Sequence, residues 1–291
     1  MARAPRGGRG LAGRRRCRLL SCRLARGPGL RCALAGGSPD AGLARAEELL
    51  DATAHLQIAT GIVNIWKADA DELADSYHRI EARHPGRLLL GIGSGHREAT
   101  PQRTLPLDAM ARYLDVLDGR DVPVQARVLS ALGPRMLAMA AERSAGTHPY
   151  LTIPSQTREA RDLLGAGALV APEQTVVLDP DPVSARRTAR AFLTRYLGMS
   201  NYTRTMRRGG FTEADVSGDG SDELVDAIVA HGDSGALAAA VRAHLDAGAD
   251  HVCLQVLPRR GDIVGTLGAV AGELGLVPDG GARPGAAPLR T

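Results

Sequence analysis

The alternation of apolar runs with amphipathic stretches becomes regular from residue 38 onward. Short runs rich in Val, Ile, Leu and Thr have the length and composition of strands, and the stretches between them space their apolar residues as helices do. Ser38 and Asp40 are candidate caps of the first helix. The predicted helices are 38–54, 69–83, 105–119, 134–144, 155–164, an interrupted stretch over 181–247, and 261–274. The predicted strands are 55–66, 87–92, 126–131, 147–153, 169–178 and 250–257.

This order of elements predicts an α/β fold with a parallel sheet. Helices of crossover length separate the strands, as they do between parallel neighbours. The strands are nearly continuous apolar runs, which is typical of a sheet covered on both faces. An open doubly wound sheet and a TIM (β/α)8-type barrel both fit this pattern. A closed barrel needs eight strands and the regular region supplies six, so a barrel here would be incomplete at its N-terminus.

The first 38 residues differ in composition from the rest of the chain. Residues 1–39 contain ten Arg and no Asp or Glu, so they carry +10 and leave −6 for residues 40–291. The segment lacks helix or strand periodicity, and its Arg and Gly content disfavours burial. A transit peptide, a phosphate-binding tail and the product of a shifted reading frame remain alternatives. The expected domains are an irregular or disordered segment 1–38, a barrel domain 39–275 and a disordered tail 276–291.

Composition argues against several classes of protein. The acidic balance of the regular region disfavours a nucleic-acid-binding core, whose surface would be basic. No run approaches eighteen apolar residues, so neither a membrane span nor a membrane partner is expected. Cys17, Cys22 and Cys32 lie in the basic segment, and their spacing predicts neither a disulfide framework nor a zinc site. The expectation is a cytoplasmic protein that acts on a small-molecule substrate.

The stretch Gly93-Ser94-Gly95-His96, which follows the second predicted strand, is the first candidate site. Ligands bind at the carboxyl ends of parallel strands in both architectures. A dinucleotide fingerprint would need a third glycine at the position of His96, and no second ligand stands at metal-binding spacing from it. Two interpretations stay open. Either the glycines admit a flat ligand with an imidazole beside it, or they only form a turn and His96 is solvated.

The other strand ends offer fewer signals. His148 is either a pocket residue or a packed strand-end residue, and Trp66 either walls a ring or packs in the core. Glu173 and Gln174 precede a strand and are expected at capping and solvent positions. Cys253 is expected to be a small core residue.

Several segments in order resemble the luciferase-like monooxygenase superfamily, and more narrowly its actinobacterial branch of coenzyme F420-dependent oxidoreductases. They are IATGIVNIW, HPGRLLLGIGSGH, VLSALGPRMLAMAAERSAGTHPYLTIPSQT, APEQTVVL and HLDAGADHVCLQVL, within roughly 42–258. The resemblance implies a TIM barrel, a possible homodimer and an enzyme that transfers a hydride between the deazaflavin coenzyme F420 and an unknown organic substrate. An FMN-dependent monooxygenase and an inactive truncated barrel are the alternatives. Relatives begin with a strand segment similar to GYGALWIPE, which residues 1–40 do not contain.

The resemblance also implies roles for individual residues. Gly61 and Ile62 match a non-prolyl cis peptide behind the deazaflavin ring, and His96 matches a general acid/base, a role suited to histidine. Leu132 and Gly133 match backbone amides near the phosphate-bearing tail of the cofactor, at a helix N-terminus. The complete expected cofactor-binding set is Gly61, Ile62, Asn64, Ser94, Gly95, Leu132, Gly133 and His148. The arginines of the interrupted stretch 198–222 either contact an anionic tail or are solvated; these are Arg204, Arg207 and Arg208.

Overall fold

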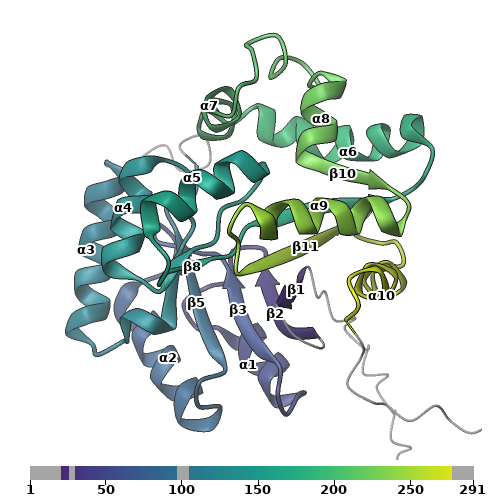
Figure 1. The fold of residues 1–291 in the computed structure, drawn as a ribbon. Helices are drawn as coiled ribbons and strands as arrows, with labels where there is room; N and C mark the ends of the chain where they lie inside the picture. Colours follow the sequence, from purple (N-terminus) through teal and green to yellow (C-terminus); the bar gives the residue numbers. More distant parts are fainter. Residues whose placement is uncertain (1–20, 26–29, 97–104, 277–291) are drawn as a thin grey trace, which may run out of the picture.

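The computed structural model describes residues 21–25, 30–96 and 105–276 (Figure 1). The strands are β1 (Ser21–Ala25), β2 (Leu30–Gly36), β3 (Gln57–Gly61), β4 (Val63–Asn64), β5 (Leu88–Gly93), β6 (Arg127–Leu129), β7 (Gly146–Thr147), β8 (Leu169–Val170), β9 (Glu173–Leu178), β10 (Val229–Gly232) and β11 (His251–Leu257). The helices are α1 (Ala44–Asp51), α2 (Ala70–Arg83), α3 (Pro106–Gly119), α4 (Pro134–Arg143), α5 (Pro154–Leu164), α6 (Pro182–Leu197), α7 (Ser200–Arg208), α8 (Asp222–Ile228), α9 (Ser234–Asp246) and α10 (Ile263–Glu273), with a 3-10 turn at Val124–Ala126.

The strands form one curled sheet in the order β10-β9-β11-β1-β2-β3-β5-β6-β7-β8, with β4 beside β5. The described pairs are parallel, except that β1 runs antiparallel to both β11 and β2. Only Ala171 and Pro172 separate β8 from β9, so these two strands carry the sheet round from β7 to β11. The predicted TIM-like α/β barrel, incomplete at its N-terminus, is confirmed, because antiparallel β1 stands where a parallel strand would close the ring.

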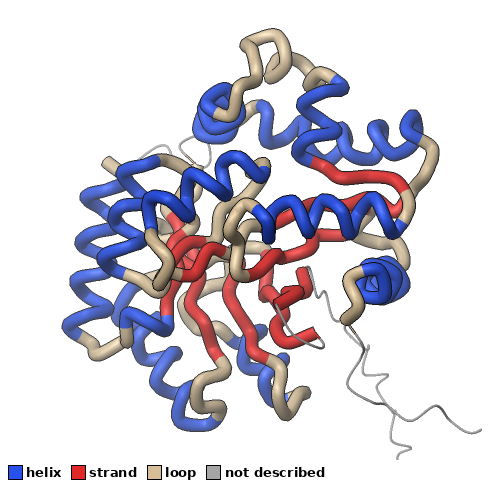
Figure 2. Tube along the Cα trace, in the orientation of Figure 1, coloured by secondary structure: helices blue, strands red, loops and turns tan. Residues whose placement is uncertain are grey.

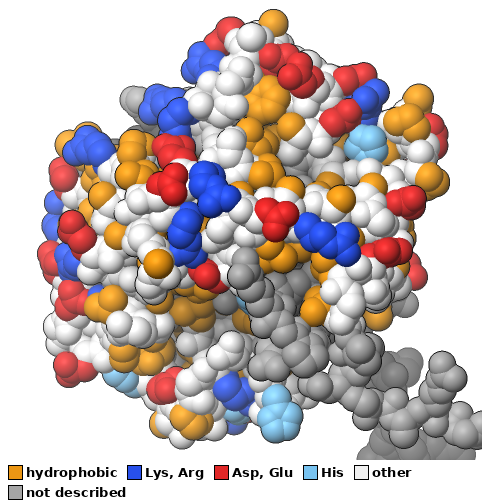
Figure 3. Space-filling model, in the orientation of Figure 1, with side chains coloured by type: hydrophobic (Ala, Val, Ile, Leu, Met, Phe, Trp, Pro, Cys, Tyr) orange, Lys and Arg blue, Asp and Glu red, His pale blue; other side chains and the backbone are white. Residues whose placement is uncertain are grey.

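Helices cover the outside of the curled sheet, and the strands lie at its centre (Figure 2). Helix α2 shows how the sequence directs this packing. Asp69 caps its N-terminus by accepting from the amides of Asp71 and Glu72, and Leu73, Tyr77 and Ile80 face the sheet at helical spacing. Acidic and basic side chains are interspersed on the face drawn in Figure 3. Within the described ranges, no helix combines the length and apolar character that crossing a bilayer would need.

Three parts of the sequence-based element prediction are wrong. Neither Ser38 nor Asp40 caps the first helix, because α1 begins at Ala44 with Leu43 at the N-cap position. The segment 1–38 was expected to be irregular, but it contains strands at Ser21–Ala25 and Leu30–Gly36. The short run over 32–35 is buried because β2 pairs in parallel with β3. Strand β10 falls inside the stretch predicted as helix, where pairing with β9 overrides the local pattern. Residues 1–20 and 277–291 lie outside the described residues, and the division into domains stays a prediction.

Strands β3 and β5 approach each other closely where Thr60 faces Gly91. A Cβ atom on Gly91 would lie 2.0 Å from the carbonyl oxygen of Thr60. The Thr60 hydroxyl donates to the Gly91 carbonyl at 2.9 Å and accepts from its amide at 2.8 Å. A Cβ atom on Gly93 would lie 2.6 Å from Cδ1 of Ile62. Gly91 is therefore required by the packing of the backbone, whereas Gly93 faces the end of the Ile62 side chain.

Replacing Gly91 with Ala is expected to destabilise the protein by about 1–3 kcal/mol, because the added methyl group meets backbone rather than a side chain that can move. Urea denaturation of both proteins measures the difference. Gly119→Ala, at a helical glycine with open space around it, is the matched control and should change stability by less than about 0.5 kcal/mol. Equal stability of Gly91→Ala and the parent would contradict the assigned contact.

Candidate active site at the carboxyl ends of the strands

Half-buried residues gather where β3, β5, β6 and β7 end, and we call this region the mouth. Its members are Gly61, Ile62, Ser94, His96, Ser130 and Tyr150. Helices α6, α7 and α8 lie at the end toward which β3 and β5 point (Figure 1). The carboxyl ends of parallel strands are the usual place for a ligand in such a fold, so the mouth is the candidate active site.

His96 is held at the mouth by residues of α7. Its Nδ1 lies 3.0 Å from Oδ1 of Asn201, and its ring centroid lies 4.9 Å from that of Tyr202. An amide oxygen only accepts, so this contact assigns the proton to Nδ1 and leaves Nε2 as the basic nitrogen of the neutral ring. The predicted acid/base residue is therefore oriented by a segment that lies about a hundred positions later in the chain.

Three of the five tyrosines of the chain form one wall of the mouth. The ring centroid of Tyr196 lies 5.6 Å from that of Tyr150 and 5.3 Å from that of Tyr202. The Tyr150 and Tyr202 rings are 6.1 Å apart, and the tilted or edge-to-face arrangement of these pairs is favourable. Burial raises the pKa of Tyr150 and of Tyr202, so both hydroxyl groups stay protonated at neutral pH. Sequence analysis missed this wall.

The peptide bond between Gly61 and Ile62 is cis, as the resemblance implied. Two residues later, Asn64 is 6% exposed and lies beneath the turn at Gly95, where a Cβ atom would come within 2.5 Å of its Nδ2. Its Oδ1 accepts from the amide of Trp66 at 3.0 Å. Asn64 therefore supports the rim of the mouth, and its predicted contact with a cofactor stays a prediction.

The predicted Leu132–Gly133 site lies at the N-terminus of α4. No side chain caps this helix, so the amides of its first turn point outward with a positive partial charge. Arg208 of α7 donates to the Leu132 carbonyl, which places a guanidinium beside these amides. Glu159 lies 3.5 Å from Nε of Arg208 and offsets part of its charge. Amides and guanidinium together suit an anion.

The other two candidate arginines, Arg204 and Arg207, are exposed, and Arg207 is paired with Glu213. Of these three candidate arginines, Arg208 is the one that contacts Leu132.

His148 and Glu173 lie in the interior of the curled sheet. His148 is 3% exposed, and its Nδ1 lies 2.7 Å from the Ala171 carbonyl oxygen. Its predicted contact with a cofactor stays a prediction. Glu173 was expected at a solvent position, which is wrong, because it is only 2% exposed. Burial raises its pKa to about 8, although the Thr175 hydrogen bond and the nearby His148 act in the opposite direction.

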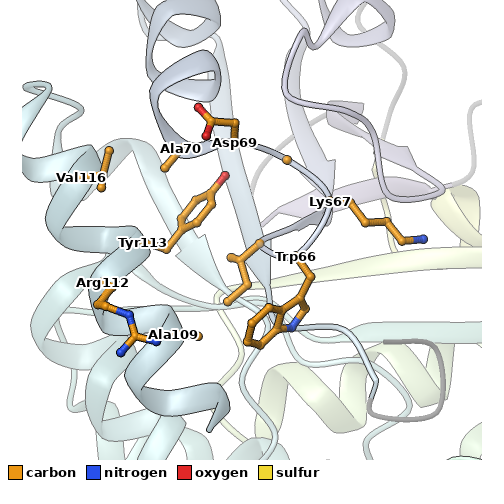
Figure 4. A pocket seen from close by; sticks show the side chains of 10 residues that line it. Trp66, Lys67, Asp69, Ala70, Ala109, Arg112, Tyr113 and Val116 are labelled. Carbon is orange, nitrogen blue, oxygen red and sulfur yellow. The ribbon is translucent and has the colours of Figure 1, made fainter. Parts of the chain in front are cut away.

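A pocket apart from the mouth lies beside Trp66 (Figure 4). Its lining includes Lys67, Arg112 and Tyr113, from the segment before α2 and from α3. The indole nitrogen of Trp66 donates to the Ser94 carbonyl at 2.7 Å, so the indole ties this pocket wall to the end of β5. None of the predicted site residues lines this pocket.

Three solved structures that share this architecture are named as enzymes. An F420-dependent secondary alcohol dehydrogenase in complex with an F420–acetone adduct matches with a TM-score of 0.64 and 15% identity, over 81% of this chain and 84% of that one. The coenzyme F420-dependent tetrahydromethanopterin reductase of Methanopyrus kandleri gives 0.65 and 18%, over 84% and 90%. The oxygenating constituent of the Pseudomonas putida 3,6-diketocamphane monooxygenase, in complex with FMN, gives 0.56 and 14%, over 86% and 89%. No family model and no curated protein matches the sequence.

The chain shares the fold of these three enzymes. The resemblance stated from the sequence is thereby confirmed for the architecture. Gly61, Ile62, Ser94 and His96 lie at or just after the ends of β3 and β5, which are neighbours in the sheet, and their predicted roles stay predictions. Residues 198–222 contribute the second side of the mouth through Asn201 and Tyr202. Tyr196 and Tyr202, close together in a chain with only 3% aromatic residues, were the sequence signal for that side.

Replacing Asn64 with Ala is expected to cost about 1–2 kcal/mol, because the Trp66 amide loses its acceptor and the Gly95 turn loses its support. Since Trp66 is the single tryptophan, its fluorescence should shift in the folded variant. Gln57→Ala, which removes an exposed amide at the start of β3, away from the mouth, is the control. An unchanged emission spectrum together with unchanged stability would show that Asn64 does not support the rim.

Proposed function

We propose that the protein is an oxidoreductase that transfers a hydride between coenzyme F420 and a small organic substrate at the mouth. The observation that carries this proposal is the His96 imidazole, held between Asn201 and Tyr202 at the strand ends of a luciferase-like barrel. The F420-dependent structures that share the fold support the choice of cofactor.

The residues present fit such a cofactor. A deazaflavin of this type has a flat ring and an anionic tail. Gly61, Ile62 and Ser94 offer a half-buried rim for the ring, and the α4 amides with Arg208 offer positive charge for the tail. The tail would then lie across Leu132 and Gly133, as the resemblance implies. Asn201 and Tyr202 would keep the imidazole in place while a ligand binds.

When bound, the deazaflavin supplies the hydride acceptor or donor. His96 handles the accompanying proton: Nε2 takes it from a substrate hydroxyl during oxidation and returns it during reduction. The hydrogen bond from Nδ1 to Asn201 fixes the tautomer and orients the ring for this transfer. The tyrosine wall limits the access of water to the same side of the mouth.

An FMN-dependent monooxygenase is the second candidate, favoured by the FMN-bound structure with the same fold. The anion-binding corner at Leu132 suits either cofactor, because both carry phosphate. Oxygenation of a substrate with added FMN and a reductant would distinguish the monooxygenase. An inactive barrel would neither transfer a hydride to or from coenzyme F420 nor oxygenate a substrate with FMN. A cytoplasmic homodimer stays a prediction.

Titration of the purified protein with coenzyme F420, followed by ligand fluorescence, should show micromolar binding that FMN does not match. Arg208→Gln is expected to weaken F420 binding by about tenfold, because a charge-assisted contact to the tail is lost. Arg204→Gln, an exposed arginine on the same helix, is the matched control and should bind as the parent does. Binding of FMN alone would favour the monooxygenase, and equal effects of the two variants would refute the tail site.

Replacing His96 with Gln is expected to lower kcat by about 10²- to 10⁴-fold while the affinity for coenzyme F420 changes little, because only proton transfer is removed. The rate of F420 reduction is the measurement, once a substrate that the protein oxidises has been identified. His78→Gln, an exposed histidine on α2, is the control. Full activity of the His96 variant would exclude it as the acid/base.

A further inference from the structure

Glu173 begins β9 opposite Cys253 of β11, and its side chain points to the inside of the curled sheet with those of Thr175 and Gln255. The residues that alternate with them on these strands, such as Val176 and Leu254, pack instead in the cluster formed with α9. A carboxyl group is therefore buried on the inner side of the sheet. Its Oε1 accepts from the Thr175 hydroxyl at 2.6 Å, and Oε2 makes no hydrogen bond of good geometry with a described residue.

A chain of hydrogen bonds runs from Glu173 to the tyrosine wall of the mouth. Thr175 Oγ1 accepts from Nε2 of Gln255 at 3.2 Å, and Oε1 of Gln255 accepts from the Tyr150 hydroxyl at 3.2 Å. The Tyr150 and Tyr196 hydroxyl oxygens are 3.2 Å apart. Nε2 of Gln255 also donates to the Tyr150 hydroxyl at 3.1 Å, so the Gln255 amide holds Thr175 and Tyr150 together. The carboxyl is thus the final acceptor of a chain that begins at the mouth.

The surroundings favour the uncharged carboxyl. The titratable groups that act on Glu173 or are acted on by it come from β11, from the segment after β7 and from α7; they are Cys253, His148, Tyr150 and Tyr202. None of them is a Lys or Arg, so within the described residues no permanent cation compensates a buried carboxylate. An unpaired buried charge is costly, and the group remains protonated instead.

We propose that Glu173 is a positioning residue: as an uncharged carboxyl it anchors the hydrogen bonds that fix the hydroxyls of Tyr150 and Tyr196, and thereby sets the wall that a ligand meets. The amide of Gln255 lies between the hydroxyl groups of Thr175 and Tyr150, so the chain does not conduct protons from one hydroxyl to the next. Its role is to fix the orientation of the tyrosine hydroxyls. The consequence for a ligand rests on the proposed function, whereas the consequence for the tyrosines does not.

The chain also makes stability depend on pH in a defined direction. The carboxyl has a pKa of about 8 in the folded protein and the ordinary value of 4.5 in the unfolded chain. Between these values the folded protein holds a proton that the unfolded chain has lost, so the stability falls as the pH rises. The unfolding equilibrium constant should increase by up to about tenfold per pH unit, equivalent to about 1.4 kcal/mol.

The first test needs no ligand. Urea denaturation between pH 5 and pH 9 is compared for the parent, Glu173→Gln and Glu142→Gln, the last being an exposed control on α4. Glu173→Gln should remove the excess loss of stability above pH 5, while the control should behave as the parent does. The near-ultraviolet circular dichroism of the parent should change with a midpoint near pH 8, and that of Glu173→Gln should not. Identical pH profiles for the parent and Glu173→Gln would overturn the proposal.

The second test separates positioning from mere packing. Thr175→Val keeps the shape of the side chain and breaks the chain at its next link, whereas Glu173→Gln preserves an acceptor for Thr175. At pH 7, Thr175→Val should alter the tyrosine circular dichroism and weaken the binding of coenzyme F420 by about tenfold. Glu173→Gln, as a separate variant, should keep both properties close to those of the parent. An unaltered tyrosine signal in Thr175→Val would overturn the proposal. A changed signal in a protein that binds no F420 would sustain it and count against the proposed function alone.

Discussion

The close approach of β3 to β5 at Thr60 and Gly91 sets the geometry on which the mouth depends. Two hydrogen bonds of the Thr60 hydroxyl bind the strands to each other at a separation that leaves no room for a side chain at position 91. The next residues of both strands are then forced into contact, with Ile62 against Gly93 and Asn64 against Gly95. The glycine-rich segment before His96 is thus shaped by its neighbour strand, and the open backbone at the rim follows from that packing.

The second side of the mouth is supplied by a segment far away in sequence. Helix α7 contributes Asn201 and Tyr202 to His96, and its last residue, Arg208, reaches the start of α4. One short helix therefore touches both the proposed acid/base and the proposed anion site. This arrangement couples the two: a displacement of α7 would loosen the imidazole and remove the guanidinium together, because the same nine residues carry both contacts.

Sequence patterns predicted the strand and helix order from residue 38 onward and most of the strand-end residues, because parallel strands buried on both faces read as plain apolar runs. The same property explains what they missed. When both faces are buried, a polar residue in a strand cannot be assigned to solvent or interior from its neighbours, so Glu173 was placed outside. Strand β10 is four residues long and exists through its pairing with β9, which no local pattern records. The tyrosine wall joins residues about fifty positions apart, and only the folded chain brings them together.

The interior of the curled sheet is chemically divided. On β2 and β3 the inward residues are apolar, with Cys32, Leu34 and Ala59 forming a cluster of their own. On β9 and β11 they are polar, and they are joined by hydrogen bonds that lead to Tyr150. The ring of His96 lies 4.9 Å from that of Tyr202, whose own ring lies 6.1 Å from that of Tyr150 at the end of the polar sector. A low-dielectric sector strengthens the electrostatic contacts of a reacting group, and a hydrogen-bonded sector fixes the groups that face it. Such a division suits a reaction in which a hydride needs a dry surface and the accompanying proton needs a donor held in one orientation.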